Sequence, residues 1–169
     1  DTIISEKIRS ILLDKDNVIN DKSELLLFLS ARAQLTTQII EKKIKKNNFI
    51  ICDRFIDSTL AYQGYGRGID LNIIKNLNSF ATNQIVPDIT FILDVSVSTS
   101  IDRLSSKDND RMENAGKEFL SKVRNAYIEI SKTNNRYKLI DCDYKDINSI
   151  HQIIIDCINK FYRKDSCNE

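Results

Sequence analysis

The stretch of sequence most informative about the fold is residues 49–68, FIICDRFIDSTLAYQGYGRG. It opens with a short uninterrupted apolar run, Phe49 to Cys52, which is typical of a strand covered on both faces. Asp53 and Arg54 follow at once, and three of the chain's four glycines then fall within five residues. We therefore expect a buried strand that ends at two charged side chains and leads into a helical segment with small polar residues.

Two more apolar runs of the same kind occur, at residues 89–95 and 137–140. Helical periodicity covers residues 21–46, 70–81, 119–131 and 147–161. Strands that alternate with helices imply right-handed crossovers and a parallel sheet. The sequence therefore predicts an α/β fold in which a parallel sheet is flanked by helices.

The longest helical pattern, residues 21–46, also carries signals for its two ends. Asp21 is a candidate N-cap with Glu24 three residues later, and four lysines near the other end suit the helix dipole. We expect one long helix that begins with a capping box.

Composition limits the classes of protein that remain. The 169 residues contain no repeat and no Pro/Gly-rich linker, so we expect residues 1–169 to form a single domain. A net charge of +1 argues against a nucleic-acid binder, and no apolar run is long enough to span a membrane. The four cysteines lack zinc-site spacing. We expect a soluble cytoplasmic protein.

The residues that close the apolar runs are the first candidates for chemistry, because ligands bind beyond the carboxyl ends of parallel strands. Asp53 could hold a hydrated magnesium ion, and the planar guanidinium of Arg54 could bridge phosphate oxygens. Taken alone, the two residues favour a surface ion pair or an arginine that anchors a loop.

Residues 49–68, together with residues 24–34 (ELLLFLSARAQ), resemble bacterial thymidylate kinases. Collinear motifs extend the resemblance over essentially the whole chain: residues 5–9, 80–81, 87–88, 93–94, 110–113, 123–127 and 140–141. The resemblance implies a P-loop NTPase-like three-layer sandwich. It also implies transfer of a phosphoryl group from ATP, with Mg²⁺, to thymidine monophosphate in deoxynucleotide synthesis, by a cytoplasmic homodimer.

For the nucleotide base, the resemblance implies that Phe28 stacks on thymine and that Arg32 donates to a thymine carbonyl. Phe28 and Arg32 are four residues apart and share a helix face. It further implies that Ser58, Thr59 and Gln63 line the base pocket and that Tyr62 lies beneath the sugar. From the residues alone, Phe28 could be a core side chain, and Ser58 and Thr59 could be helix caps.

For the phosphates, the resemblance implies that Arg54 clamps the acceptor phosphate and that Asp53 acts on the metal through its water shell. It assigns residues 103–113 to a lid, in which Arg111 reaches phosphate and Arg103 lies near the adenine, and it places Asp143 in the loop that edges the adenine. By composition alone, residues 103–113 could be a charged surface loop.

One family motif is missing from the sequence. The GxxxxGK[ST] phosphate-binding loop is absent, since the four glycines are Gly64, Gly66, Gly68 and Gly116. We expect the first strand, the P-loop and the second strand to be missing from this chain, which alone would be inactive. The alternatives are a paralogue that binds nucleotide without catalysis, and another nucleoside monophosphate or deoxynucleoside kinase.

Overall fold

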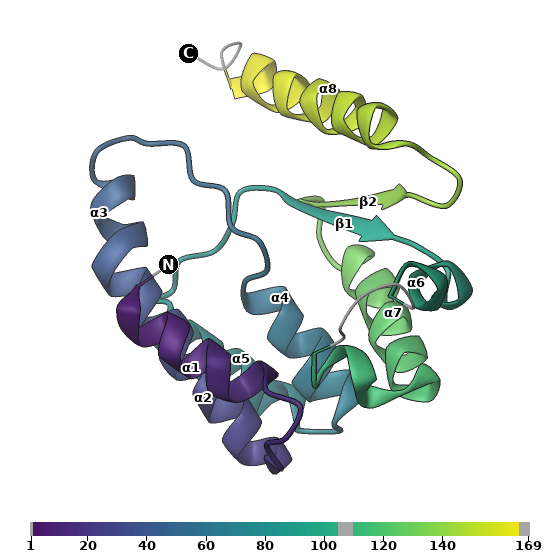
Figure 1. Ribbon diagram of the computed structural model, residues 1–169. Helices are drawn as coiled ribbons and strands as arrows, with labels where there is room; N and C mark the ends of the chain where they lie inside the picture. Colours follow the sequence, from purple (N-terminus) through teal and green to yellow (C-terminus); the bar gives the residue numbers. More distant parts are fainter. Residues whose placement is uncertain (1, 105–109, 166–169) are drawn as a thin grey trace.

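The computed structural model describes residues 2–104 and 110–165, which form many helices and a small sheet (Figure 1). In chain order the elements are α1 (Ile3–Leu13), α2 (Asp21–Leu35), η1 (Thr36–Ile40), α3 (Glu41–Ile44), α4 (Ile56–Thr59), η2 (Leu60–Gly66), α5 (Leu71–Ala81), β1 (Thr90–Asp94), α6 (Val97–Leu104), η3 (Glu113–Ala115), α7 (Lys117–Ser131), β2 (Tyr137–Asp141) and α8 (Ile147–Asp165). Among these, η1 and η2 are π-helical and η3 is a 3-10 turn.

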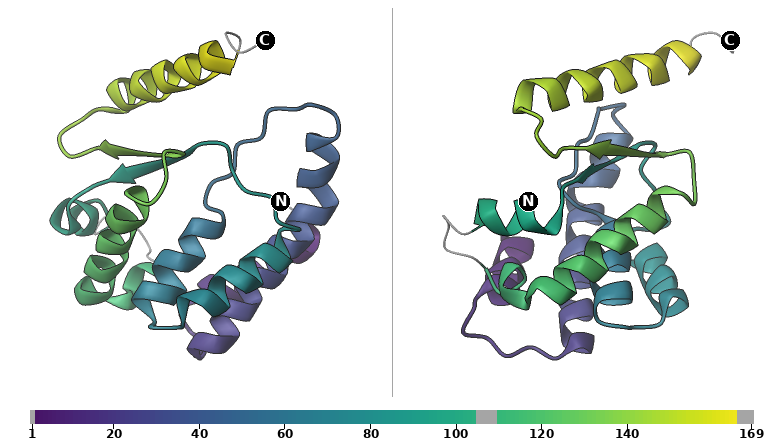
Figure 2. Two further views of the ribbon diagram at one scale, coloured as in Figure 1. Left: turned by 180° about the vertical axis from the view of Figure 1, so that it is seen from behind. Right: turned by 90° about the vertical axis from the view of Figure 1, so that its right-hand side faces the viewer.

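The sheet confirms the parallel pairing that the sequence predicted. β1 and β2 pair in parallel register, from Thr90 opposite Tyr137 to Asp94 opposite Asp141. The chain between them passes through α6 and α7, and α7 lies on one side of the sheet while α8 lies on the other (Figures 1 and 2). The sheet and its two flanking helices therefore form a small α/β unit.

The strand predicted at residues 49–52 is wrong. This segment pairs with neither β1 nor β2, and Phe49 and Ile51 expose 60% and 85% of their surfaces. The Phe49 ring instead lies 6.3 Å from that of Tyr162 in α8. An apolar run becomes a strand only where another strand satisfies its backbone groups, and among the described residues none lies beside it.

The helix predicted over residues 21–46 is confirmed as three consecutive segments, α2, η1 and α3. Its capping box is wrong: Asn20 is the N-cap, and its side chain accepts the Ser23 N–H at 2.9 Å. Asp21 is therefore the first helical residue, and Glu24 is free to point into the protein, where it is fully buried.

The helix formed by α4 and η2, residues 56–66, lies between two apolar clusters. One comprises Ala61, Met112, Phe119, Val123, Ala126 and Ile130. The other comprises Leu25, Leu29, Ile74 and Ala81. Leu60 packs against both clusters. A Cβ at Gly66 would lie 2.7 Å from the ring of Phe119, so the close approach of η2 to α7 requires glycine there.

π-Helical turns are rare and are often found at functional sites. One of the two π-helical segments, η2, contains Tyr62 and Gln63 of the predicted substrate site. Among the described residues, no helix is long and apolar enough to cross a membrane.

Candidate active site

The candidate site lies where α2 faces the α4–η2 helix. Glu24, Phe28 and Arg32 recur every four residues and share one face of α2. Arg32 donates to the Phe55 carbonyl, just before α4, at 3.0 Å, whereas Glu24 accepts from Gln63, in η2, at 2.8 Å. The two helices thus run antiparallel, with Phe28 between these two contacts.

Arg32 is held firmly at one end of this face. It donates from one nitrogen to Asn78 Oδ1 at 2.7 Å and from another to the Phe55 carbonyl, and Asn78 donates in turn to the Ile56 carbonyl at 3.1 Å. Burial lowers the pKa of Arg32 to about 10, so it stays charged at neutral pH. Two contacts leave three of its five N–H groups for other acceptors.

Phe28 and Tyr62 supply the aromatic surface of the site. Both are half-buried, and both pack against the apolar cluster around Ala61 and Phe119. The Tyr62 ring makes edge contacts with Phe119 and Tyr127, at centroid distances of 6.0 and 6.4 Å. Phe28 therefore lines the core and the site together, so the core interpretation and the base-pocket interpretation are compatible.

Arg54 has a backbone conformation that is unusual for a side chain of its size. Its φ of 63° is in the left-handed region, which costs of order 1–3 kcal/mol outside glycine and is concentrated at functional sites. Its guanidinium carbon lies 5.0 Å from the Tyr62 ring centre. The strained turn directs the arginine over the aromatic residue that the sequence placed beneath the sugar.

The two predicted pocket hydroxyls have different environments. Ser58 Oγ accepts a hydrogen bond from Tyr127 at 2.8 Å, and burial raises the pKa of Tyr127 to about 12, so that its hydroxyl stays a donor. Thr59 Oγ1 is buried and has no hydrogen-bond partner within residues 2–104 and 110–165. Neither side chain caps α4, which begins after Phe55 without a side-chain cap, so the capping interpretation is wrong.

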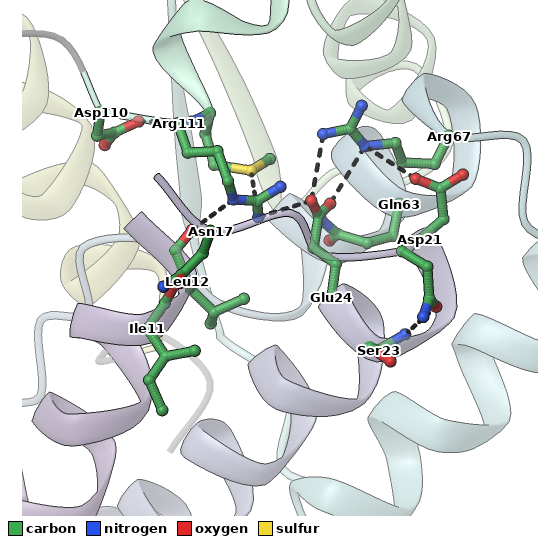
Figure 3. Close-up of polar contacts among 12 residues, drawn as sticks. Ile11, Leu12, Asn17, Asp21, Ser23, Glu24, Gln63, Arg67, Asp110 and Arg111 are labelled. Carbon is green, nitrogen blue, oxygen red and sulfur yellow. Dashed lines mark hydrogen bonds and ion pairs between the residues drawn. The ribbon is translucent and has the colours of Figure 1, made fainter. Parts of the chain in front are cut away.

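A buried carboxylate beside the pocket was not expected from the sequence (Figure 3). Glu24 Oε2 contacts Arg67 at 3.2 Å and Arg111 at 2.7 Å, and Glu24 Oε1 accepts from Gln63 and from Arg67 Nε. Burial alone would raise the pKa of Glu24, but the hydrogen bonds from Gln63, Arg67 and Arg111 together lower it. Its place on the same helix face as Phe28 and Arg32 is the one sequence signal that could have indicated its role.

Arg111, predicted to reach the donor phosphates, lies in this carboxylate cluster. Besides its ion pair with Glu24, its Nε donates to the Leu12 carbonyl at 2.8 Å. The predicted lid, residues 103–113, is described only at its two ends, since residues 105–109, which include Lys107, lie outside the described residues.

The other two predicted nucleotide contacts lie near the carboxyl ends of the strands. Both carboxylate oxygens of Asp143 accept the Ser96 N–H, at 3.1 Å, which lowers the pKa of Asp143. Arg103 lies in α6, which begins just after Ser96, and it is exposed. Asp94, at the end of β1, pairs bidentately with Arg124 of α7 at 2.8 and 2.9 Å. These residues form a group separate from the contacts between α2 and α4–η2.

Asp53 is the predicted metal residue. Within the described part of the chain, no three His, Cys, Asp or Glu side chains gather as a metal cage would require. Mg²⁺ needs no such cage, since it keeps several waters and binds through one or two carboxylates together with substrate phosphates. Asp53 is exposed and precedes Arg54 directly, so it fits a water-mediated magnesium contact.

Comparison with known proteins identifies the family of this chain. The thymidylate kinase family profile matches residues 1–154. The chain is 44% identical to the thymidylate kinase of Thermosipho africanus, over 94% of this chain and 79% of that protein. It is 42% identical to that of Chlorobium phaeobacteroides, over 94% and 77% respectively.

Among solved structures, the thymidylate kinase of Ehrlichia chaffeensis superposes with a TM-score of 0.75 at 37% identity, covering 94% of this chain and 76% of that one. The sequence motifs, the fold and these relatives agree, and the chain belongs to the thymidylate kinase family.

Proposed function

We propose that this protein transfers the terminal phosphoryl group of ATP to thymidine monophosphate in cytoplasmic deoxynucleotide synthesis. The observation that carries the proposal is the pairing of α2, which bears Phe28 and Arg32, with α4–η2, which bears residues 58–63, in a member of the thymidylate kinase family. Hydrogen bonds from Arg32 to the Phe55 carbonyl and from Gln63 to Glu24 join the two helices. This arrangement combines a flat aromatic surface, a fixed cation and small polar groups at one place.

The proposed acceptor site binds the base along this helix pair. Phe28 offers a ring for stacking, which is worth about 1 to 3 kcal/mol per base. The unused N–H groups of Arg32 can donate to a thymine carbonyl, since Asn78 and Phe55 already fix its guanidinium. Tyr62, held by its aromatic neighbours, would pack beneath the sugar and leave little room for a 2′-hydroxyl.

Arg54 and Asp53 are the proposed phosphate-directed groups. The left-handed turn holds Arg54 over Tyr62, from where its fork of N–H groups can bind the acceptor phosphate and guide the transferring group. Asp53 would hold Mg²⁺ through water. When bound, the metal neutralises charge that develops on the phosphoryl oxygens, and because that transition state is loose, no general base is needed.

The donor side is proposed to follow the P-loop NTPase plan, a three-layer sandwich in which Arg103, Arg111 and Asp143 border ATP. The printed sequence contains no GxxxxGK[ST] motif, so we expect these 169 residues alone to be inactive and transfer to require such a loop in addition. For Arg111, reaching phosphate would mean leaving Glu24.

We also propose a homodimer. Large apolar side chains are exposed on α2 and α5: Leu26, Ile73 and Phe80. Phe80 exposes 84% of its surface. Apolar exposure of this kind on neighbouring helices suits burial against a second copy.

The test of the acceptor assignment is Arg32→Ala in a protein that carries the P-loop segment. Calorimetry should show weaker binding of thymidine monophosphate and nearly unchanged binding of ATP, whereas Arg163→Ala, an exposed change on α8, should alter neither. Equal losses for both nucleotides would contradict the assignment. Binding of thymidine monophosphate without ADP formation would favour the non-catalytic alternative.

A further inference from the structure

The acceptor sites of the Glu24 carboxylate are all occupied by neighbouring side chains. Its Oε1 accepts from Gln63 Nε2 at 2.8 Å and from Arg67 Nε at 3.3 Å. Its Oε2 accepts from a second Arg67 nitrogen at 3.2 Å and lies 2.7 Å from Arg111 (Figure 3). An ionised carboxylate offers about four acceptor sites and no donor, so these four contacts saturate it.

This saturated carboxylate decides which way the Gln63 amide points. A glutamine side chain can present either its NH₂ group or its carbonyl oxygen in a given direction. Turned the other way, the carbonyl of Gln63 would face a fully buried anion, which repels it. The NH₂ group must therefore face Glu24, and the carbonyl oxygen is the end of Gln63 that remains for another partner.

Gln63 is buried, 2% exposed, on the side of η2 that meets α2. It follows Tyr62 directly, lies about one turn beyond Thr59, and faces the α2 surface that carries Phe28 one turn after Glu24. Among the described residues, no hydrogen bond ends on its carbonyl oxygen. A base stacked on Phe28 would present its hydrogen-bonding edge to this end of the pocket.

We infer that Glu24 is a positioning residue that sets base preference, by holding the Gln63 carbonyl as an acceptor for a pyrimidine with a hydrogen at N3. Thymine and uracil carry that donor, whereas N3 of cytosine is an acceptor and would oppose the carbonyl. The inference rests on the proposed function, since it concerns the same acceptor pocket.

Arg67 and Arg111 contact Glu24 and keep it charged and in place. Arg67 is also 3.5 Å from Asp21 and lies 4.4 Å from the Phe119 ring centre. Arg111 is fixed by the Leu12 carbonyl. Because Arg111 lies in the described end of the predicted lid, residues 103–113, the Glu24 carboxylate contacts both Gln63 and that end of the lid.

The experiment compares three nucleotides by calorimetry: thymidine, deoxyuridine and deoxycytidine monophosphate. In Glu24→Gln, the new amide can accept or donate, so Gln63 can pair with it in either orientation. We expect the preference for the thymidine over the deoxycytidine nucleotide to fall by about tenfold or more, with the deoxyuridine nucleotide following the thymidine one. Asp21→Asn removes the same charge from the same cluster without touching Gln63, and it should leave the preference unchanged.

Each outcome is decisive. Equal losses for all three nucleotides in a folded Glu24→Gln protein, or an unchanged preference, would overturn the inference while leaving the proposed function intact. A parent protein that binds none of them would overturn the proposed function itself. If unpaired arginines prevent folding, the charge-balanced double variant Glu24→Gln/Arg67→Gln gives the same comparison, and an unchanged preference there overturns the inference.

Discussion

Two buried carboxylates connect the α4–η2 helix to its surroundings, Glu24 from α2 and Asp57 from α4 itself, and their partners differ. Glu24 contacts Gln63 in the pocket, along with Arg67 and Arg111. Asp57, 4% exposed, faces the sheet instead, where it accepts from both terminal nitrogens of Arg136, at 2.6 and 3.1 Å, and from the Tyr137 hydroxyl at 2.7 Å.

The difference shows that two buried carboxylates with similar arginine partners can have different roles: Asp57 connects parts of the fold, and Glu24 is the one proposed to act on the ligand. The Asp57 cluster joins the start of α4 to the beginning of both strands, through Arg136, Tyr137 and Thr90. Within the described part of the chain, it makes no hydrogen bond to a predicted substrate residue. Both clusters contact the helix that follows Arg54, and of the two only the Glu24 cluster includes a side chain of the proposed base pocket, Gln63.

The largest effect is expected at Arg54, which belongs to neither cluster. Arg54→Ala should lower turnover by roughly a thousandfold or more, because a phosphate-directed arginine stabilises the transferring group. The free energy of unfolding measured in urea should be almost unchanged, since the Arg54 guanidinium packs over the Tyr62 ring. Arg54→Lys keeps the charge without the fork and should recover only part of the rate. Activity within a few-fold of the parent would reduce Arg54 to a structural role.

Asp57→Asn should produce the largest loss of stability. Removing one partner of a buried ion pair leaves Arg136 without its counter-charge, at a cost of about 3–5 kcal/mol in the free energy of unfolding. Glu129→Gln, which breaks the exposed pair with Lys132, should cost at most about 1 kcal/mol. Urea unfolding measures both. If Asp57 has only a structural role, folded Asp57→Asn protein should keep its preference among nucleotides. A changed preference would contradict the distinction between Asp57 and Glu24.

The parts of the fold that could be predicted are those that local sequence determines. Helical periodicity located α5, α7 and α8, and the apolar runs located β1 and β2. The run at residues 49–52 failed because pairing is a long-range property, and its side chains alone do not show whether a neighbouring strand is present.

The same reasoning explains what was found and missed at the site. Phe28 and Arg32 share a helix face, so periodicity places them together. The partners of Glu24 lie 39 and 43 residues away along the chain in Gln63 and Arg67, and Asp57 lies 79 residues from Arg136. Contacts at such separations leave no periodic pattern in the sequence, and the neighbours of Glu24 alone indicate a capping residue.

A smaller effect of Glu24 is expected in the pH dependence of the free energy of unfolding. Its folded pKa lies below the ordinary value of 4.5, so its contribution is present above that value and is lost as pH falls through the folded pKa. The difference in unfolding free energy between the parent and Glu24→Gln should therefore be greatest at neutral pH and shrink in acid. Urea unfolding across this pH range measures it, and a constant difference would mean that Glu24 keeps the same protonation in both states.

The smallest effect concerns two buried hydroxyls, Thr59 in the pocket and Thr36 in η1. Both Oγ1 atoms lack a hydrogen-bond partner within the described residues, so replacing either threonine with valine, which has the same shape, removes a desolvated group. Each change should leave the free energy of unfolding the same or raise it by at most about 1 kcal/mol. Only Thr59→Val should weaken binding of thymidine monophosphate, by a few-fold, because Thr59 belongs to the proposed base pocket and Thr36 does not. A loss of stability in Thr59→Val would mean that its hydroxyl already has a partner, such as a bound water. Equal affinity in the two variants would remove Thr59 from the pocket and leave Gln63 as the polar group that reads the base.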